Sequence, residues 1–370
     1  MKKILLICTS SGSIVSFRKN LILKFQELGF NVAAIAFDGK RRADIEKLGV
    51  ELHVINDDSR SINPFKLFCL IRRYKKIINK VQPDAVFTFM LKPNIYGSRA
   101  ARKAGVKYIF SMVEGGGDVF GKSGIKWKII RKYCCAGYKR GFNCSRKVFF
   151  TNNDDKAEFI KLNLVDSEKT EVVNGIGVDV EAFAYKPITD HKTFLMVARM
   201  LESKGVFDYC NAARIVKRKF PDAVFNYIGG EQTITVDDIK QYTDDGSINY
   251  LGITNNIKKF YEDCTVQVLP TYYREGLGLV NAEAGAVGRP TITCDVIGAR
   301  DTVVDGYNGF FVKTKSPEDL AEKMIYFLEN PNEADEMGRN NRKLVEEKFD
   351  QRKINKRITD IISKCMEECK

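Results

Sequence analysis

The chain has 370 residues, of which 44% are hydrophobic, so it is long enough for two α/β domains and too long for one ordinary core. Its apolar runs are too short to span a bilayer, and no low-complexity tract predicts extensive disorder. The net charge of +13 is divided unevenly, with +16 in residues 1–180 and −3 in the remainder, which predicts an anionic partner for the first part.

Short apolar runs alternate with amphipathic stretches along the first half of the chain. Lys2 and Lys3 precede the first run, which we interpret as a strand rather than as a signal sequence. The strands expected by this pattern are Lys3–Cys8, Asn31–Phe37, Val50–Ile55, Asp84–Phe89, Lys107–Met112 and Lys147–Phe150. Helical spacing occurs between them in Ile14–Leu28, Pro64–Val81 and Asn94–Ala104. Such β-α repeats predict a parallel sheet with helices on both faces.

The pattern lapses near residues 175–192 and then resumes. The second set of expected strands is Phe194–Ala198, Ala223–Ile228, Thr265–Leu269, Thr291–Cys294 and Gly309–Val312, followed by helices at 316–329, 332–348 and 350–367. We therefore predict two doubly wound α/β domains, residues 1–180 and 181–370, with the final helix packing back on the first domain. Ligands of such sheets bind beyond the carboxyl ends of the strands, so one shared cleft is expected.

The segment from Leu269 to Pro290 contains the largest group of residues suited to binding a ligand. It predicts a strand, a glycine-containing turn and a helix that begins near Leu279. Glycines let backbone amides approach a ligand, and a helix start presents unpaired N–H groups, which together suit a diphosphate. Glu275 and Glu283 can accept hydrogen bonds from separate hydroxyl groups of one ligand.

A second charged turn follows the strand that opens the second domain. Arg199 and Lys204 flank this turn, which leads into a helix. A guanidinium and an ammonium group suit a pyrophosphate whose negative charge grows as it departs. Taken alone, either turn is better explained by solvated surface charges, but the two occur together.

The pairing of Arg199 and Lys204 with Glu275-x7-Glu283 resembles the retaining glycosyltransferase family 4, which has the GT-B fold of two Rossmann-like domains. The resemblance extends over essentially the whole chain, through the segments Gly177–Asp179, Leu251–Gly252 and Asp305–Gly309. Three first-domain segments, Arg60–Pro64, Lys92–Asn94 and Val113–Gly117, resemble bacterial N-acetylgalactosaminyltransferases that extend saccharides carried on polyprenyl diphosphate.

This resemblance implies a role for each matching residue. Glu275 holds donor-sugar hydroxyls, Glu283 holds ribose hydroxyls, and Arg199 and Lys204 stabilise the leaving diphosphate. The resemblance also implies a donor contact from Gly12, which lies in a glycine-containing loop. Ile253 and Thr254 are implied to line the nucleobase pocket. The implied backbone amide contacts to the sugar and phosphates come from Gly276, Leu277, Gly278 and Leu279. Lys92 and Asn94 are expected to meet the acceptor, and UDP is the implied nucleotide.

Two positions depart from the family pattern. Many members have a histidine near the reacting carbon, in the loop after the fifth strand of the first domain. Here that loop contains Glu114, which is expected to occupy the histidine's place. Ile176 replaces the asparagine that usually precedes Gly177-Val-Asp, which removes a side-chain contact at the domain junction.

We predict that neither a metal ion nor a cofactor is required. The resemblance implies transfer with retention at the anomeric carbon, in which the departing phosphate takes the proton of the acceptor. Cationic groups and a helix terminus then replace a metal ion. His53 and His191 have no cysteine cluster nearby, and the adjacent aspartate pairs form no Asp-x-Asp at a strand end. Ten cysteines without a Cys-x-x-Cys pair are typical of reduced thiols in cytoplasm.

Residues 121–153 contain nine basic and no acidic residues. Part of this run reads as a basic amphipathic helix, which suits an anionic membrane surface, and its expected contacts are Lys126, Trp127, Lys128, Arg131 and Lys132. We therefore expect a cytoplasmic enzyme attached peripherally to the inner face of the cell membrane. The resemblance implies that it transfers a sugar (an N-acetylhexosamine is favoured) from a UDP-sugar to a lipid-linked saccharide.

Three alternatives stay open. The basic balance also suits nucleic acid, although the sequence contains no nucleic-acid-binding module, so we expect no such partner. A sugar-nucleotide epimerase would share the two-domain shape without an acceptor. A glycosyltransferase could instead use a soluble acceptor.

Overall fold

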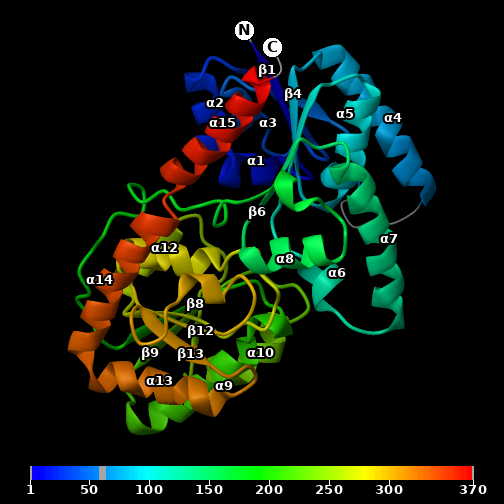
Figure 1. Cartoon of the computed structure of the whole chain (residues 1–370). Coiled ribbons are helices and arrows are strands. Elements are labelled where there is room, and N and C mark those ends of the chain that lie inside the picture. The colour runs from blue at the N-terminus through cyan, green and yellow to red at the C-terminus, as the bar shows by residue number, and fades with distance from the viewer. Residues whose placement is uncertain (1, 58–63, 369–370) are drawn as a thin grey trace. The chain divides into compact units, whose positions relative to one another are not determined.

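The computed structural model describes residues 2–57 and 64–368 (Figure 1). The chain forms two compact units, one made of Met1–Ile176 with Arg352–Lys370 and the other of Gly177–Gln351. Residues 60–63 of the segment Arg60–Pro64 lie outside the described residues. The sequence places the boundary after residue 180, four residues later than the structure, and it expects the final helix to pack back on the first domain, where the structure groups it.

The first unit is built on a parallel sheet in the order β3-β2-β1-β4-β5-β6-β7. Its strands are β1 (Lys3–Ile7), β2 (Asn31–Ala36), β3 (Glu51–Val54), β4 (Ala85–Phe89), β5 (Tyr108–Val113), β6 (Lys147–Phe150) and β7 (Thr170–Val172). Six of them were expected; β7 has only three residues and lacks a long apolar run. The alternation between apolar runs and helices thus predicts the order of elements correctly, because a buried parallel strand is apolar on both faces.

Helices cover both faces of this sheet. They are α1 (Ser11–Phe17), α2 (Lys19–Glu27), α3 (Arg42–Glu46), α4 (Pro64–Val81), the π-helix η1 (Pro93–Gly97), α5 (Ser98–Lys103), α6 (Gly117–Gly121), α7 (Ile125–Phe142), α8 (Asn153–Lys161), the 3-10 helix η2 (Ser167–Lys169) and α15 (Gln351–Glu367). The helix expected over 14–28 is divided at Arg18, whose side chain is buried.

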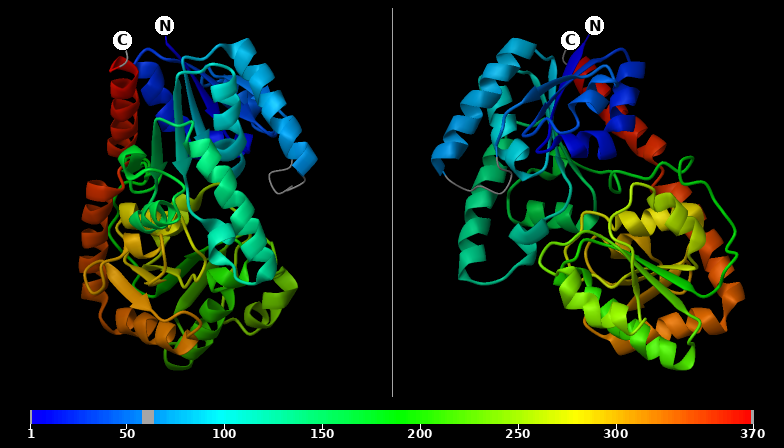
Figure 2. Two further views of the ribbon diagram at one scale, coloured as in Figure 1. Left: turned by 45° about the vertical axis from the view of Figure 1, so that its right-hand side comes forward. Right: turned by 180° about the vertical axis from the view of Figure 1, so that it is seen from behind.

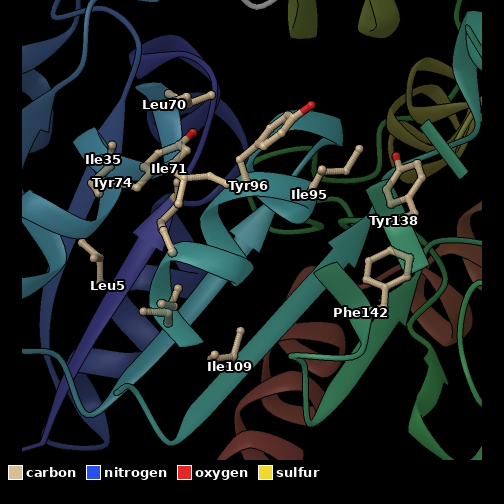
Figure 3. Packing of buried hydrophobic residues seen from close by; sticks show 14 of the residues in the cluster. Leu5, Ile35, Leu70, Ile71, Tyr74, Ile95, Tyr96, Ile109, Tyr138 and Phe142 are labelled. Carbon is tan, nitrogen blue, oxygen red and sulfur yellow. The ribbon is translucent and has the colours of Figure 1, made fainter. Parts of the chain in front are cut away.

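One face of the first sheet carries α4, η1, α5 and α7, whose apolar residues pack over the strands (Figure 3). Tyr74 of α4, Tyr96 of η1 and Tyr138 of α7 belong to this core. The other face carries α1, α2 and α3 together with α15, whose Ile354, Ile358, Ile362 and Met366 repeat every four residues (Figure 2). This spacing places them on one side of the helix and explains why α15 belongs to the first unit.

The second unit has a parallel sheet in the order β10-β9-β8-β11-β12-β13. Its strands are β8 (Thr193–Val197), β9 (Val224–Ile228), β10 (Asn249–Tyr250), β11 (Val266–Leu269), β12 (Thr291–Cys294) and β13 (Gly309–Val312). The helices are η3 (Glu202–Lys204), α9 (Val206–Lys219), α10 (Val236–Asp244), α11 (Ile257–Asp263), α12 (Leu279–Val287), η4 (Arg300–Thr302), α13 (Pro317–Glu329) and α14 (Pro331–Lys348). β10 was not expected, since two residues form no readable pattern.

The two stretches that connect the units run beside each other. The amide of Val178 donates to the carbonyl of Phe349 at 2.8 Å, and the amide of Gln351 donates to the carbonyl of Val178 at 2.9 Å. Each stretch therefore satisfies backbone groups of the other where the chain leaves and re-enters the second unit.

Candidate functional site

The candidate site lies where the strand order of the second unit reverses. β8 pairs with β9 on one side and with β11 on the other, so the loops that follow β8 and β11 diverge from neighbouring strand ends. Ligands of doubly wound sheets bind at such a switch point. Lys204 follows β8 and Glu275 follows β11, so the topology brings two predicted site residues to one place.

Lys204 and Glu275 form an ion pair in which the lysine Nζ donates to Oε1 of the glutamate. Both side chains are mostly shielded, with exposed fractions of 11% and 13%. The ammonium group also lies 5.1 Å from the centre of the Tyr273 ring, which favours a cation. A mostly buried ammonium and carboxylate beyond a strand end can bind an anion and a hydroxyl group respectively.

Two glycines hold the Glu275 loop against its neighbours. A Cβ on Gly205 would lie 2.2 Å from the carbonyl oxygen of Pro270, and one on Gly298 would lie 2.4 Å from that of Glu275. Both glycines have positive φ, 76° and 81°, which other residues rarely adopt. The amide of Glu275 donates to the carbonyl of Ile297 at 3.1 Å. The loop is thus fixed by backbone contacts on both sides.

Helix α12 begins directly after this loop, as the sequence predicts. No side chain caps its start at Gly278. In this structure two of the expected amide donors are used internally: Gly278 donates to the carbonyl of Gly298 at 3.1 Å and Leu279 to that of Leu277 at 2.8 Å. Gly276 and Leu277 lie in the loop that joins Glu275 to the helix.

Glu283 lies one turn inside α12 and is held by a residue that the sequence did not single out. The hydroxyl of Tyr261, in α11, donates to Oε2 of Glu283 at 3.0 Å, and Tyr261 is fully buried. Burial raises the pKa of Glu283 from 4.5 to about 7, while the tyrosine hydrogen bond acts in the opposite direction. No local pattern distinguishes Tyr261 from other tyrosines, because the contact joins two helices.

Arg289 fixes the end of α11 that carries Tyr261. Its guanidinium is fully buried and donates to the carbonyls of Tyr261 and Glu262, both at 2.8 Å, and to that of Lys186 at 2.7 Å. The last carbonyls of a helix have no partners within the helix, so this side chain satisfies them. Tyr261 is therefore anchored through its backbone as well as its hydroxyl.

Arg199 does not join the Lys204–Glu275 pair in this structure. It is exposed and donates to Oε1 of Gln232 at 3.0 Å. Beyond the end of β10, the side chain of Ile253 is 79% exposed, and the hydroxyl of Thr254 accepts from the amide of Asn256 at 3.0 Å. These predicted nucleotide contacts thus lie on the loops that follow β8 and β10, on the β9 side of the switch point.

In the first unit, Glu114 follows β5 and pairs with Arg18. Arg18 is almost completely buried, and its guanidinium lies 4.3 Å from the centre of the Phe89 ring. The sequence missed Arg18, for which the only signal was a basic residue inside an apolar helical stretch. Glu114 is thus a carboxylate that a buried cation orients.

Gly12 lies in the first turn of α1, because the helix begins at Ser11 rather than after the predicted loop. The hydroxyl of Ser10 accepts from the amide of Ser13 at 3.1 Å and caps this helix. Lys92 is also mostly buried and pairs with Asp57 at 3.3 Å.

Asn94 differs from the sequence-based expectation, which has its side chain meet the acceptor. Its side chain is fully buried in η1, where Oδ1 accepts from the hydroxyl of Thr88 and Nδ2 donates to the carbonyl of Met112, both at 2.8 Å. These bonds tie η1 to β4 and β5. Asn94 therefore supports the sheet and does not present its amide to an acceptor in this structure.

The predicted membrane contacts divide between two sides of α7. Lys126, Lys128 and Lys132 are exposed. Arg131 instead donates to the carbonyls of Val119 and Lys122, both at 2.8 Å, and half-buried Trp127 lies four residues before it on the same side of the helix. Arg131 and Trp127 thus support the preceding segment, because helical spacing turns them away from the exposed face.

Within residues 2–57 and 64–368, no three His, Cys, Asp or Glu side chains gather in a group suited to a metal ion. No helix in that part of the chain is long and apolar enough to cross a membrane.

Two units, each built on a doubly wound parallel sheet, are the architecture of the GT-B fold. Two family models match the chain: "Glycosyl transferase 4-like" over residues 3–152 and "Glycosyl transferases group 1" over residues 179–344. The chain therefore belongs to the GT-B glycosyltransferases that these families describe.

Its relatives include enzymes of lipid-linked saccharide assembly. The chain is 26% identical, over 87% of its length and 88% of the relative, to N,N'-diacetylbacillosaminyl-diphospho-undecaprenol alpha-1,3-N-acetylgalactosaminyltransferase of Campylobacter jejuni. It is 28% identical, over 69% of each chain, to UDP-Gal:alpha-D-GlcNAc-diphosphoundecaprenol alpha-1,3-galactosyltransferase of Escherichia coli.

Solved structures agree with the fold. A glycosyltransferase from Rickettsia africae superimposes with a TM-score of 0.78 at 19% identity, covering 99% of both chains. Anabaena HepE in complex with UDP superimposes with a TM-score of 0.79 at 17% identity, covering 98% of this chain and all of the other.

Proposed function

We propose that this glycosyltransferase moves a sugar from a UDP-sugar to a saccharide carried on polyprenyl diphosphate, with retention of the anomeric configuration. The observation that carries the proposal is the mostly buried Lys204–Glu275 pair at the switch point of the second sheet. The names of the Campylobacter and Escherichia relatives support the lipid-linked acceptor, and the UDP complex of HepE supports the nucleotide. The N-acetylgalactosaminyltransferase relative favours an N-acetylhexosamine as the donor sugar.

The second unit binds the donor in this proposal. Glu283 accepts hydrogen bonds from the ribose hydroxyls, and the segment Gly276–Leu279 places backbone amides and the start of α12 near the diphosphate. Ile253 and Thr254 line the nucleobase. Donor binding releases Lys204 from Glu275, so that the ammonium turns to the diphosphate and the carboxylate accepts from sugar hydroxyls.

The reaction then exchanges one bond at the anomeric carbon for another. The bond from this carbon to the β-phosphate oxygen breaks, and a bond to the acceptor oxygen forms on the same face of the sugar. The proton of the acceptor hydroxyl passes to the departing phosphate oxygen. Lys204 and Arg199 stabilise the charge that develops on the diphosphate, so the proposed reaction requires no metal ion.

The first unit contributes the acceptor side. Glu114, held by Arg18, accepts a hydrogen bond from the acceptor, and Lys92 exchanges Asp57 for the acceptor diphosphate. Gly12 faces the donor phosphates. A lipid-linked acceptor also places the enzyme at the inner face of the cell membrane, where we propose that it attaches peripherally through α7.

A direct test combines donor binding with transfer. We expect UDP-sugars to raise the unfolding temperature more than GDP- or ADP-sugars, since a ligand that binds only the folded state stabilises it. With a polyprenyl-diphosphate saccharide present, the parent protein should elongate the saccharide and release UDP, and Glu283→Ala should do neither.

Three outcomes would contradict the proposal. Elongation by Glu283→Ala at the parental rate would remove Glu283 from the donor site. An isomerised sugar formed without acceptor would indicate an epimerase. Equal transfer to a saccharide without its lipid would indicate a soluble acceptor.

A further inference from the structure

Three helices of the first unit, far apart in sequence, lie side by side on one face of its sheet. Helix α4 packs against α5 and η1, and α7 packs against η1 and α5 (Figure 2). Their inward residues belong to one apolar core, which also contains Leu5 of β1 and Ile109 of β5 (Figure 3). The outward residues of the three helices therefore face away from the same side of the sheet.

This layer, α4 with α5 and α7, contains many basic residues, and none of the three helices contains an acidic residue. Exposed basic residues occur along each helix: Arg72, Arg73, Lys75, Lys76 and Lys80 in α4, Arg102 and Lys103 in α5, and Lys126, Lys128, Lys132, Lys139 and Arg140 in α7. The sequence alone separates the clusters of α4 and α7 by more than forty residues, and the fold joins them through α5.

The amino-terminal half of α7 adds an apolar stripe to this layer. Ile125, Ile129 and Tyr133 follow one another at intervals of four residues and are 80%, 66% and 47% exposed. They lie on the side of the helix opposite Tyr138 and Phe142, which are buried. Lys126, Lys128 and Lys132 flank the stripe on both of its sides.

An exposed isoleucine pair within a basic face requires an explanation, since water solvates neither side chain favourably. A nucleic acid would satisfy the lysines but would offer the isoleucines little apolar surface. An anionic bilayer offers both: headgroup phosphates for the basic residues and acyl chains below them for the stripe.

We propose that the whole layer of α4, α5 and α7 is the surface by which the enzyme lies on an anionic membrane, with Ile125 and Ile129 inserted below the headgroups. The inference deepens the proposed function, because it assigns the attachment to a surface three helices wide rather than to one amphipathic helix. The basic residues of α4 are thus part of the membrane contact although they lie far from α7 in the sequence.

Vesicle flotation tests this surface without any transfer reaction. The parent should float with vesicles of phosphatidylcholine and phosphatidylglycerol and stay unbound with phosphatidylcholine alone. Lys126→Gln, Lys128→Gln and Lys132→Gln together should lower the partition coefficient on the order of 100-fold, at about fivefold for each lysine. In a separate variant, changing Lys75, Lys76 and Lys80 of α4 to glutamine should lower it by a similar factor.

A matched control removes the same charge from the opposite face of the sheet. Lys353, Lys356 and Lys364 are exposed residues of α15, and changing them to glutamine should leave flotation within a factor of about three of the parent. Ile125→Ser with Ile129→Ser should lower binding more than tenfold at constant charge. Because both isoleucines are exposed, the folded state should keep the parental unfolding temperature and UDP affinity.

Several results would overturn the inference. Parental flotation of the α4 variant would confine the contact to α7, and parental flotation of the isoleucine variant would exclude insertion. If the lysine variants floated like the parent but no longer bound RNA in a gel-shift assay, the surface would be assigned to nucleic acid. A parent that floats as expected but binds no UDP would refute the proposed function and leave the membrane surface intact.

Discussion

Tyr261→Phe removes one hydroxyl and tests how Glu283 recognises the donor. In the structure this hydroxyl donates to Oε2 of Glu283 at 3.0 Å, while burial raises the pKa of the carboxyl group to about 7. A hydrogen bond to a charged group is worth about 1.5–3 kcal/mol, and about 1.4 kcal/mol corresponds to a factor of ten. We therefore expect UDP affinity at pH 7 to fall at least tenfold in the variant.

The pH dependence should change in a defined direction. The ionised carboxylate accepts ribose hydroxyls, so UDP affinity in the parent should decline as the pH falls through about 7. Without the tyrosine hydroxyl the ionised form loses a donor, the pKa rises further, and the decline should begin at a higher pH. Titration calorimetry with UDP between about pH 5.5 and 8.5 measures both the affinity and this midpoint.

Two controls separate orientation of Glu283 from general damage. Tyr242→Phe removes a comparable hydroxyl, which donates to Asn211 at 2.8 Å in the same unit, and should leave UDP affinity unchanged. With 2′-deoxy-UDP, which lacks one partner of Glu283, the penalty of Tyr261→Phe should shrink, because the two changes act on one contact. Parental affinity and an unshifted midpoint in Tyr261→Phe would refute the reasoning.

Three further changes have defined outcomes. Lys204→Met should lower kcat about 100-fold or more in a UDP-release assay, since it removes a cation from the leaving diphosphate; a loss below threefold would remove Lys204 from the reaction. Glu283→Gln should stabilise the folded protein at pH 8 by at most about 3 kcal/mol and so raise its unfolding temperature. The native carboxyl group binds its proton more tightly than the unfolded chain does, so the parent protein loses stability as the pH rises from 4.5 to about 7. An unchanged melting curve would show that the carboxyl group is not desolvated. Gly298→Ala should lower both stability, by about 1 kcal/mol or more, and transfer, because its Cβ would displace the Glu275 backbone; calorimetry and the transfer assay would detect either effect, and parental values in both would contradict the tight contact.

The order of strands and long helices could be predicted because parallel strands and amphipathic helices have distinct apolar periods. The proximity of Lys204 and Glu275 could also be predicted, since both follow strands that a doubly wound sheet places side by side. The partners of Glu114 and Glu283 could not be predicted from the sequence. Arg18 and Tyr261 reach them from other helices, and no local pattern determines such contacts.

Arg131 and Asn94 have partners within the fold that the sequence-based site did not include, for two different reasons. Arg131 could have been placed correctly, because helical spacing puts it on the side of Tyr138 and away from Ile129. Asn94 could not, since a polar residue in a short motif gives no indication that a π-helix buries it between two strands.

The placement of α15 has a consequence for the order of folding during synthesis. The apolar side of α15 covers the same sheet face as Ile22 of α2 and Ile45 of α3, yet the ribosome makes it only after the entire second unit. Until then the nascent first unit exposes the apolar surface that α15 later covers, and this surface can cause aggregation or bind a chaperone. The second unit, by contrast, is continuous in sequence and can close its own core before the first unit is complete.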